Sequence, residues 1–140
     1  MDDKTITLVQ ESFAKVEPIK ATAAELFYSD LFATAPEVRP LFNGNMNEQG
    51  MKLMGTLAVV VNGLHTLDQI VPAAQALAIR HVDYGVQPEH YDKVGASLIR
   101  TLEQGLGPDF TSDVRTAWIE AYTTLSSVMK QAAYPKEALQ

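Results

Sequence analysis

The sequence predicts an all-α fold, and three observations lead to that class. Apolar residues recur every three or four positions along nearly the whole chain, and no segment alternates apolar and polar residues as a half-buried strand does. Short breaks rich in Gly, Pro and Asn separate these periodic segments. About seven helices with short connections and no internal repeat fit a single domain over residues 1–140, with roughly the last eight residues as a loose tail.

The first third of the chain contains three expected helices. The first should end before Pro18, because proline cannot continue a helix. Its inner stripe is Ile6, Val9, Phe13 and Val16. The second stripe is Ala24, Phe27, Tyr28, Leu31 and Phe32. Thr34 and Glu37 have the spacing of a capping box around Pro36, which predicts a short helix that carries Leu41 and Phe42. Residues 43–47 then have the composition of a turn.

Two helices are expected in the middle of the chain. The longer one has a mostly apolar face made of Gln49, Leu53, Thr56, Leu57, Val60 and Leu64. In the next one, Pro72 is expected in the first turn, where its missing N–H costs nothing. That helix has an inner face of Ala74, Leu77, Ala78 and His81. Gly85 should end it, because glycine readily takes the left-handed conformation of a helix cap.

Two further helices complete the chain. Pro88 begins the first of them, which runs to the break at residues 105–108 and has the stripe Tyr91, Val94, Leu98 and Leu102. Thr111 is expected to cap the last helix, which has the most regular pattern of all. Its stripe is Val114, Ala117, Trp118, Ala121, Tyr122, Leu125, Val128 and Met129.

Composition excludes several classes of function. The net charge is −6 with no basic run, so neither nucleic acid nor an anionic membrane is an expected partner. The absence of cysteine excludes disulfides, thiolate metal sites, iron–sulfur clusters and covalent haem attachment. The start of the chain is acidic and lacks the apolar core of a signal peptide, and the longest apolar stretch, residues 57–61, is too short to span a membrane. We therefore expect a cytoplasmic protein.

His81 is the residue most open to a chemical interpretation. Ala74, Leu77 and Ala78 precede it on the same helical face, so its imidazole should lie against something buried. In an arbitrary helical protein, the commoner explanation is a hydrogen-bonded core histidine. One histidine cannot make a zinc site, which needs three or four ligands. A haem iron needs only one, because the porphyrin supplies four nitrogens.

Three other residues support that interpretation only in combination. Tyr28, Gln49 and Phe42 would each be ordinary in a helical protein, as a packed tyrosine, a solvated helix residue and a core aromatic. A hydrogen-bonding tyrosine and glutamine on inward faces, together with a single histidine, are the set that a gas-binding haem pocket would use.

Several segments in the same order resemble a known family. Residues 27–42, 49–54, 80–86 and 90–95 are similar to the corresponding segments of single-domain bacterial haemoglobins and of the globin half of flavohaemoglobins. Residues 106–111 and 117–122 also resemble neuroglobins and methanotroph globins of the Hell's Gate type. The likeness covers about residues 5–129. It implies the globin fold, a three-on-three helical sandwich around a non-covalently held haem b.

The resemblance also implies a role for each matching residue. His81 matches the proximal iron ligand, and Phe42 matches the aromatic that wedges against the porphyrin. The distal residues on the gas side are Tyr28, Gln49 and Leu53. Further haem contacts are expected from Leu57, Leu77, Tyr91 and Val94.

The chain departs from flavohaemoglobins on the proximal side. Tyr91 matches a tyrosine that in those proteins joins a carboxylate in polarising the proximal histidine. This chain lacks the glutamates that they carry after the position of Tyr122, and its nearest carboxylate, Glu137, follows Pro135 near the end of the sequence. The resemblance therefore does not carry that charge relay over to this chain.

These residues lead to an expected function. Hydrogen bonds from Tyr28 and Gln49, at roughly 1–1.5 kcal/mol each, would slow O₂ release on the order of 30–150-fold. Slow release suits a protein that holds O₂ for reaction better than an oxygen-transport carrier. We expect a monomer or weak homodimer that binds O₂, CO and NO and oxidises NO to nitrate. Its electrons would come from a separate reductase, because the sequence contains no flavin or nicotinamide domain.

The sequence leaves three alternatives to this function to consider. One is a haem-based sensor that acts on a separate partner. Another is a haem-free globin-like module, which the retained His81, Phe42, Tyr28 and Gln49 disfavour. Binding of a phycobilin is excluded by the absence of cysteine. For the iron itself, Gln49 is a poor sixth ligand and His65 lies some four turns away, so Tyr28 is the candidate ligand in the ferric state at high pH.

Overall fold

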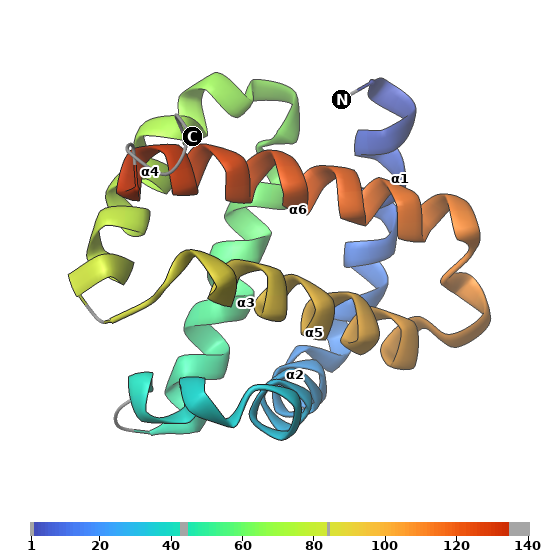
Figure 1. The fold of residues 1–140 in the computed structure, drawn as a ribbon. Coiled ribbons are helices and arrows are strands. Elements are labelled where there is room, and N and C mark those ends of the chain that lie inside the picture. Colours follow the sequence, from blue (N-terminus) through green and yellow to red (C-terminus); the bar gives the residue numbers. More distant parts are fainter. Residues whose placement is uncertain (1, 43–44, 84, 135–140) are drawn as a thin grey trace.

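The computed structural model describes residues 2–42, 45–83 and 85–134, and every regular element in those ranges is helical (Figure 1). The α-helices are α1 (Asp3–Val16), α2 (Lys20–Thr34), α3 (Met46–Asn62), α4 (Leu67–Asp83), α5 (Pro88–Leu106) and α6 (Ser112–Ala133). Short 3₁₀ helices lie between them: η1 (Glu17–Ile19), η2 (Pro36–Leu41), η3 (Leu64–Thr66) and η4 (Gly107–Asp109). The all-α prediction is confirmed. Most of the expected tail, residues 135–140, lies outside the described residues.

The helices form two crossing layers (Figure 1). α5 and α6 run side by side across one face, and α1 and α3 cross behind them. α2 packs on both α5 and α3, and α1 packs on α6. α4 covers one end of the molecule and packs mainly on α6. This is the three-on-three arrangement of a globin, and it places α3 and α4 on different neighbours.

Side chains and one glycine fix the helix ends as the sequence suggests. Thr111 accepts a hydrogen bond from the Val114 N–H and caps α6, as predicted. α1 ends at Val16, before Pro18. Gly85 has a φ of +94°, so the predicted left-handed conformation after α4 is confirmed. Gly85 thus marks the point where α4 has ended and the segment toward α5 begins.

The predicted capping box at Thr34 and Glu37 is wrong. Thr34 is the last residue of α2, and its hydroxyl donates to the carbonyl of Asp30 one turn earlier. Glu37 instead forms an ion pair with Lys93 of α5. Because Thr34 is still helical, its side chain is directed toward the preceding turn and cannot cap the next element. The short helix that follows is a 3₁₀ helix that begins at Pro36.

The predicted position of Pro72 is also wrong. α4 begins at Leu67, five residues earlier than expected, so the proline lies inside the helix. Leu67 packs against the main core and Ile70 packs over Gly63, and this burial favours the earlier start. The helix gives up one backbone hydrogen bond at Pro72. The helix before it is correspondingly shorter than predicted, because α3 ends at Asn62 and Leu64 belongs to η3.

None of the described helices alone is long and apolar enough to cross a membrane. Two consecutive segments, Met46–Asn62 and Leu64–Val82, reach that length and composition together, with a bend of 62° between them.

α2 and α5 are joined by a charged cluster at their surface. Asp30 accepts hydrogen bonds from the Ser97 hydroxyl at 2.7 Å and from Arg100 Nη2 at 2.6 Å and Nε at 2.8 Å. The Arg100 guanidinium holds the pKa of the Asp30 carboxyl below its ordinary value. Because the pKa is lower in the folded chain, this pair stabilises the fold above pH 4 and the contribution is lost as the pH falls through the folded pKa.

Asp30→Asn should lower the free energy of unfolding by about 1–2 kcal/mol near neutral pH, because it removes the charge that Arg100 faces. Urea unfolding followed by circular dichroism between pH 3 and pH 8 measures the effect. The difference from the wild type should be constant above about pH 5 and shrink below pH 4. Asp109→Asn is the matched control, since the Asp109–Lys15 pair is well exposed and should contribute little. Equal effects of the two substitutions would contradict the prediction.

Candidate functional site

The buried residues form two separate hydrophobic clusters, and the predicted site residues are divided between them. The main cluster contains Tyr28, and Phe42, Leu53, Leu57 and Val94 pack against it as half-buried side chains. The second, smaller cluster consists of Ala74, Ala78, Tyr91 and Met129, with Leu77 packed against it. The two sides of the predicted pocket thus belong to different cores. Half-buried leucine, valine and phenylalanine side chains leave apolar surface that a flat apolar group would cover.

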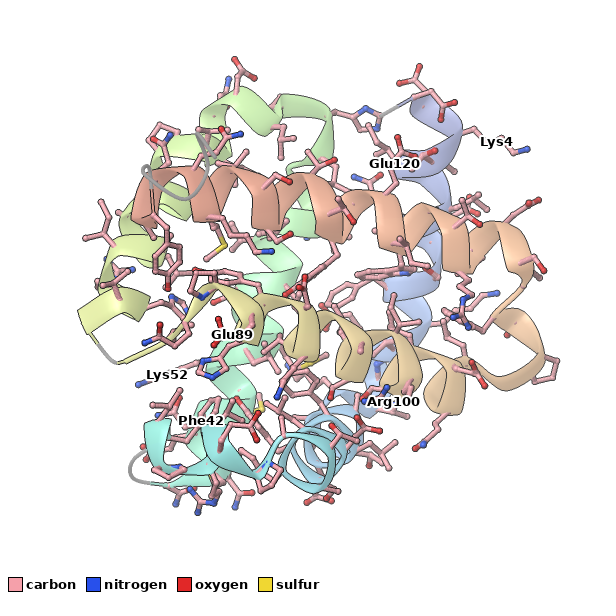
Figure 2. All side chains as sticks on the ribbon, in the orientation of Figure 1. Lys4, Phe42, Lys52, Glu89, Arg100 and Glu120 are labelled. Carbon is pink, nitrogen blue, oxygen red and sulfur yellow. The ribbon has the colours of Figure 1, made fainter. Side chains whose placement is uncertain are left out.

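Tyr28 lies in an aromatic group on the main-cluster side. Its ring centroid lies 5.4 Å from that of Phe42 and 5.7 Å from that of Phe32, and the side chain is 8% exposed. Phe42 follows η2, on the same side of the molecule as Lys52 of α3 and Glu89 of α5 (Figure 2). The contacts with Phe32 and Phe42 fix the plane of the Tyr28 ring.

The structure brings the Tyr28 hydroxyl close to the backbone of Gln49. The hydroxyl donates to the Gln49 backbone carbonyl at 3.3 Å. The Gln49 side chain is half-buried in the first turn of α3. Burial raises the pKa of Tyr28 to about 12, so the hydroxyl keeps its proton and can donate a hydrogen bond. Ligation of iron by a Tyr28 phenolate would therefore need strongly alkaline solution or displacement of the proton by the metal.

Gly50 explains how α3 reaches Tyr28. A side chain at this position would place its Cβ 2.9 Å from the Ala24 Cβ and 3.9 Å from the Tyr28 ring. Only glycine lets the start of α3 approach α2 this closely without a shift. Gly50 was not among the site residues predicted from the sequence. Its place directly after Gln49, in a helix that faces the small residues of α2, was the available signal.

His81 lies on the second-cluster side, near the end of α4. Its Nδ1 lies 2.7 Å from the Leu77 carbonyl oxygen. A carbonyl can only accept, so Nδ1 carries the proton of this hydrogen bond. A histidine with this hydrogen bond can bind a metal through Nε2. In the part of the chain that the structure describes, no group of three or more His, Cys, Asp and Glu side chains could hold a metal ion. A single-histidine ligand fits haem iron and excludes a conventional zinc site there.

Tyr91 lies beside His81, with the two ring centroids 6.4 Å apart. Its backbone carbonyl accepts a hydrogen bond of 2.6 Å from the Tyr122 hydroxyl, which anchors this part of α5 on α6. The Tyr91 hydroxyl is buried and has no hydrogen-bond partner among the described residues. A buried orphan hydroxyl is costly and often indicates a missing group. Burial raises the pKa of Tyr91 to about 12, so the phenol is neutral.

Two side chains from the end of α6 complete the surroundings of Tyr91. The Tyr134 ring lies edge-on, 6.4 Å from the Tyr91 ring, and its hydroxyl donates to the Val86 carbonyl. The Lys130 amine lies 5.8 Å from the centre of the Tyr91 ring. Neither residue was predicted as part of the site. Lys130 follows Tyr122 by eight positions on one helix, which places the two on the same face of α6, but this spacing does not predict a contact with Tyr91 of α5.

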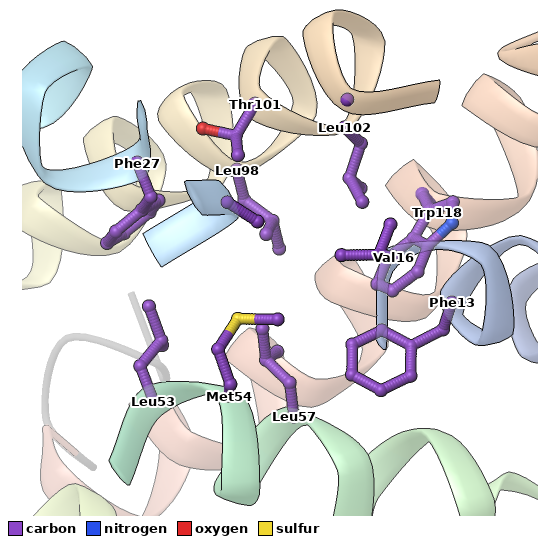
Figure 3. A pocket seen from close by; sticks show the side chains of 12 residues that line it. Phe13, Val16, Phe27, Leu53, Met54, Leu57, Leu98, Thr101, Leu102 and Trp118 are labelled. Carbon is purple, nitrogen blue, oxygen red and sulfur yellow. The ribbon is translucent and has the colours of Figure 1, made fainter. Parts of the chain in front are cut away.

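A small apolar cavity of about 20 Å³ lies within the main cluster (Figure 3). Leu53, Met54 and Leu57 of α3 form one wall, opposite Leu98 and Leu102 of α5. The cavity has room for about one water-sized molecule, and its walls favour an apolar occupant. Of the predicted site residues, only Leu53 and Leu57 line it. Phe13, Val16, Ala23, Phe27, Thr101, Gly105 and Trp118 complete the lining. This cavity is too small for a cofactor.

The family model for globins matches residues 25–129, three quarters of the chain and all of the predicted site. This chain belongs to the globin family.

Relatives of this globin include flavohemoproteins from three bacteria. The protein from Vibrio cholerae is 30% identical over 127 residues, which cover 88% of this chain and 32% of the relative. The protein from Halalkalibacterium halodurans is 31% identical over 137 residues, with coverage of 91% and 33%. The protein from Bacillus subtilis is 26% identical over 129 residues, with coverage of 90% and 32%. The chain thus spans about a third of the length of these relatives.

Solved structures show the same fold. One is an engineered carbene transferase made from a Rhodothermus marinus protein that is assigned as a nitric oxide dioxygenase. Its sequence is 26% identical to this globin. The two structures match with a TM-score of 0.87 over 99% of this globin and 97% of that chain. A bacterial globin from Campylobacter jejuni is 24% identical, with a TM-score of 0.84 over 97% and 99% of the two chains.

Membership of the globin family implies a haem cofactor that binds diatomic gases, and the residues present fit that group. The two hydrophobic clusters leave half-buried apolar side chains on both sides, and Tyr91 has a buried hydroxyl without a partner. His81, in the Nδ1-protonated form, is on one side, and Tyr28 with Gln49 is on the other. A porphyrin between the clusters would cover the apolar side chains and join the two cores.

Proposed function

We propose that this globin binds haem b without a covalent bond, through His81, and holds O₂, CO or NO beside Tyr28 and Gln49. The observation that carries the proposal is the division of the core, with His81 and Tyr28 on its opposite sides. The haem would supply an iron with one coordination position for a gas. Phe42, Leu53, Leu57, Leu77 and Val94 would provide its apolar contacts.

The residues of this chain would control the gas side through hydrogen bonding. Tyr28 is a protonated, buried donor, and its ring is held in place by its aromatic neighbours. The hydroxyl would turn from the Gln49 carbonyl toward a polar gas ligand, since a 3.3 Å bond to a carbonyl is at the long end of the range. Gln49 can donate through its amide. Both effects favour tight binding and slow release of O₂.

We further propose that this globin oxidises NO to nitrate. Support comes from its flavohemoprotein relatives and from the Rhodothermus marinus neighbour assigned as a nitric oxide dioxygenase. A protein that retains O₂ gives NO time to react with it. Turnover would require an electron donor of the reductase class, and we propose that a separate reductase supplies it.

Visible spectra of the haem-reconstituted protein test this function. The ferrous protein should be high-spin and convert to stable oxygenated and CO-bound forms. An NO electrode would then measure NO consumption by the oxygenated protein with NADH and an added flavin reductase. Failure to take up haem would overturn the whole proposal and favour a haem-free globin module. Haem binding without catalytic NO consumption would disprove the proposed dioxygenase activity and leave the proposed gas binding in place.

A further inference from the structure

Lys130 lies close to Tyr91, which in turn is a neighbour of the predicted iron ligand His81. Its amine lies 5.8 Å from the centre of the Tyr91 ring, within the range of a cation–π contact. The Tyr91 ring in turn lies 6.4 Å from the His81 ring. A lysine, a tyrosine and the predicted iron ligand are therefore neighbours in a row, with Tyr91 between the other two.

The Lys130 charge is only partly neutralised. Its amine pairs with Asp92 at 3.4 Å, but the two groups differ in burial: the Lys130 side chain is 31% exposed and that of Asp92 is 81% exposed. Water screens the exposed carboxylate more strongly than the amine that lies against Tyr91. The positive charge beside the Tyr91 ring thus belongs to the less exposed member of the ion pair.

Among the described residues, no carboxylate bonds to the Tyr91 hydroxyl, because that atom has no partner there. Glu137, the nearest later carboxylate in the sequence, lies outside the described residues. The charge in contact with the Tyr91 ring is thus positive, whereas the matching tyrosine of flavohaemoglobins is joined by a carboxylate.

We propose that Lys130 is a positioning residue that raises the reduction potential of the haem through Tyr91 and His81. The proposal rests on haem binding as proposed above. Oxidation of the iron adds one positive charge to the site, and a nearby cation makes that addition less favourable. Lys130 would therefore stabilise the ferrous form, the form that binds O₂, against oxidation.

The test is the midpoint potential, measured by spectroelectrochemical titration of the haem-loaded protein. Lys130→Met should shift the reduction equilibrium toward the ferric form by about three- to tenfold, which is about 30–60 mV for one electron. Lys130→Arg should preserve the wild-type potential, because it keeps the charge. The Fe–His stretching frequency of the ferrous protein gives a second readout, and it should rise in Lys130→Met, since the cation no longer weakens the donation from His81.

Asp92→Asn distinguishes the effect of the Lys130 charge from the effect of the Lys130–Asp92 ion pair. This variant breaks the same pair but leaves the cation on Tyr91, so its potential should rise or stay unchanged. If Lys130 only clamped α6 to α5, the two variants would shift the potential in the same direction. That result, or a change of less than twofold in Lys130→Met, would overturn the proposal. If the wild-type chain takes up no haem, the proposed function and the proposal on Lys130 both fail. If haem binds but its midpoint potential does not respond to Lys130→Met, only the proposal on Lys130 fails.

Discussion

His81→Ala should abolish specific haem binding. His81 is the one predicted protein ligand of the iron, and its Nδ1–H bond to the Leu77 carbonyl fixes the ring nitrogen that would coordinate the metal. Without a bond from His81 to the iron, the haem would keep only its apolar contacts with the two clusters. The dissociation constant of the haem should then rise on the order of 100-fold or more. Titration of haem into the apoprotein, followed by the Soret band, measures the constant.

His65→Ala is the matched control for this substitution. His65 lies in η3, is half exposed and has Asp3 as its partner at 3.8 Å, so its removal should leave haem affinity unchanged. His81→Gly with added imidazole would separate loss of the ligand from loss of the fold, because the free base should restore the spectrum. Wild-type affinity and an unchanged spectrum in His81→Ala would show that another residue binds the iron.

Tyr28→Phe should raise the O₂ dissociation rate at least about tenfold. The substitution removes a hydroxyl that burial keeps protonated and leaves the ring and its contacts with Phe32 and Phe42 intact. A hydrogen bond to a polar ligand in a dry pocket contributes about 1–1.5 kcal/mol, and 1.4 kcal/mol corresponds to tenfold in rate. Stopped-flow displacement of O₂ by CO gives the rate directly.

Two comparisons make the Tyr28 experiment specific. CO carries little negative charge when bound, so its dissociation rate should change much less than that of O₂. Tyr134→Phe removes a hydroxyl on the other side of the site, where it bonds to the Val86 carbonyl, and should leave the O₂ rate close to wild type. An O₂ dissociation rate within twofold of wild type in Tyr28→Phe would show that the Tyr28 hydroxyl does not stabilise bound O₂.

The order and character of the helices could be predicted because they depend on local patterns. The spacing of apolar residues located all of the long helices, and Thr111 and Gly85 ended up in their expected roles. The errors arose where distant contacts decide the outcome. Pro72 is tolerated inside α4 because Leu67 and Ile70 find partners earlier in the chain. Thr34 has the right spacing for a cap, but α2 extends through it.

The site was predictable in its chemistry and less so in its arrangement. A lone histidine on an apolar helical face suggested a porphyrin, and the resemblance to globins assigned roles to Tyr28 and Gln49. Helical spacing could not show that Gly50 lets α3 approach α2 so closely. Nor could it show the stack of Lys130 on Tyr91, because that contact joins residues on two helices 39 positions apart (130 minus 91).

The division of the core also determines how the chain behaves before it meets haem. α4 is held mainly by α6, through the smaller cluster of Ala74, Ala78, Tyr91 and Met129, while the other long helices share the larger core. Helices with few buried contacts open most readily, so amide protons in α4 should exchange faster than those in α2 and α5. An open α4 is also where a protease would cut first. Haem bound between the two clusters would close α4, so it should slow both hydrogen exchange and cleavage in that helix.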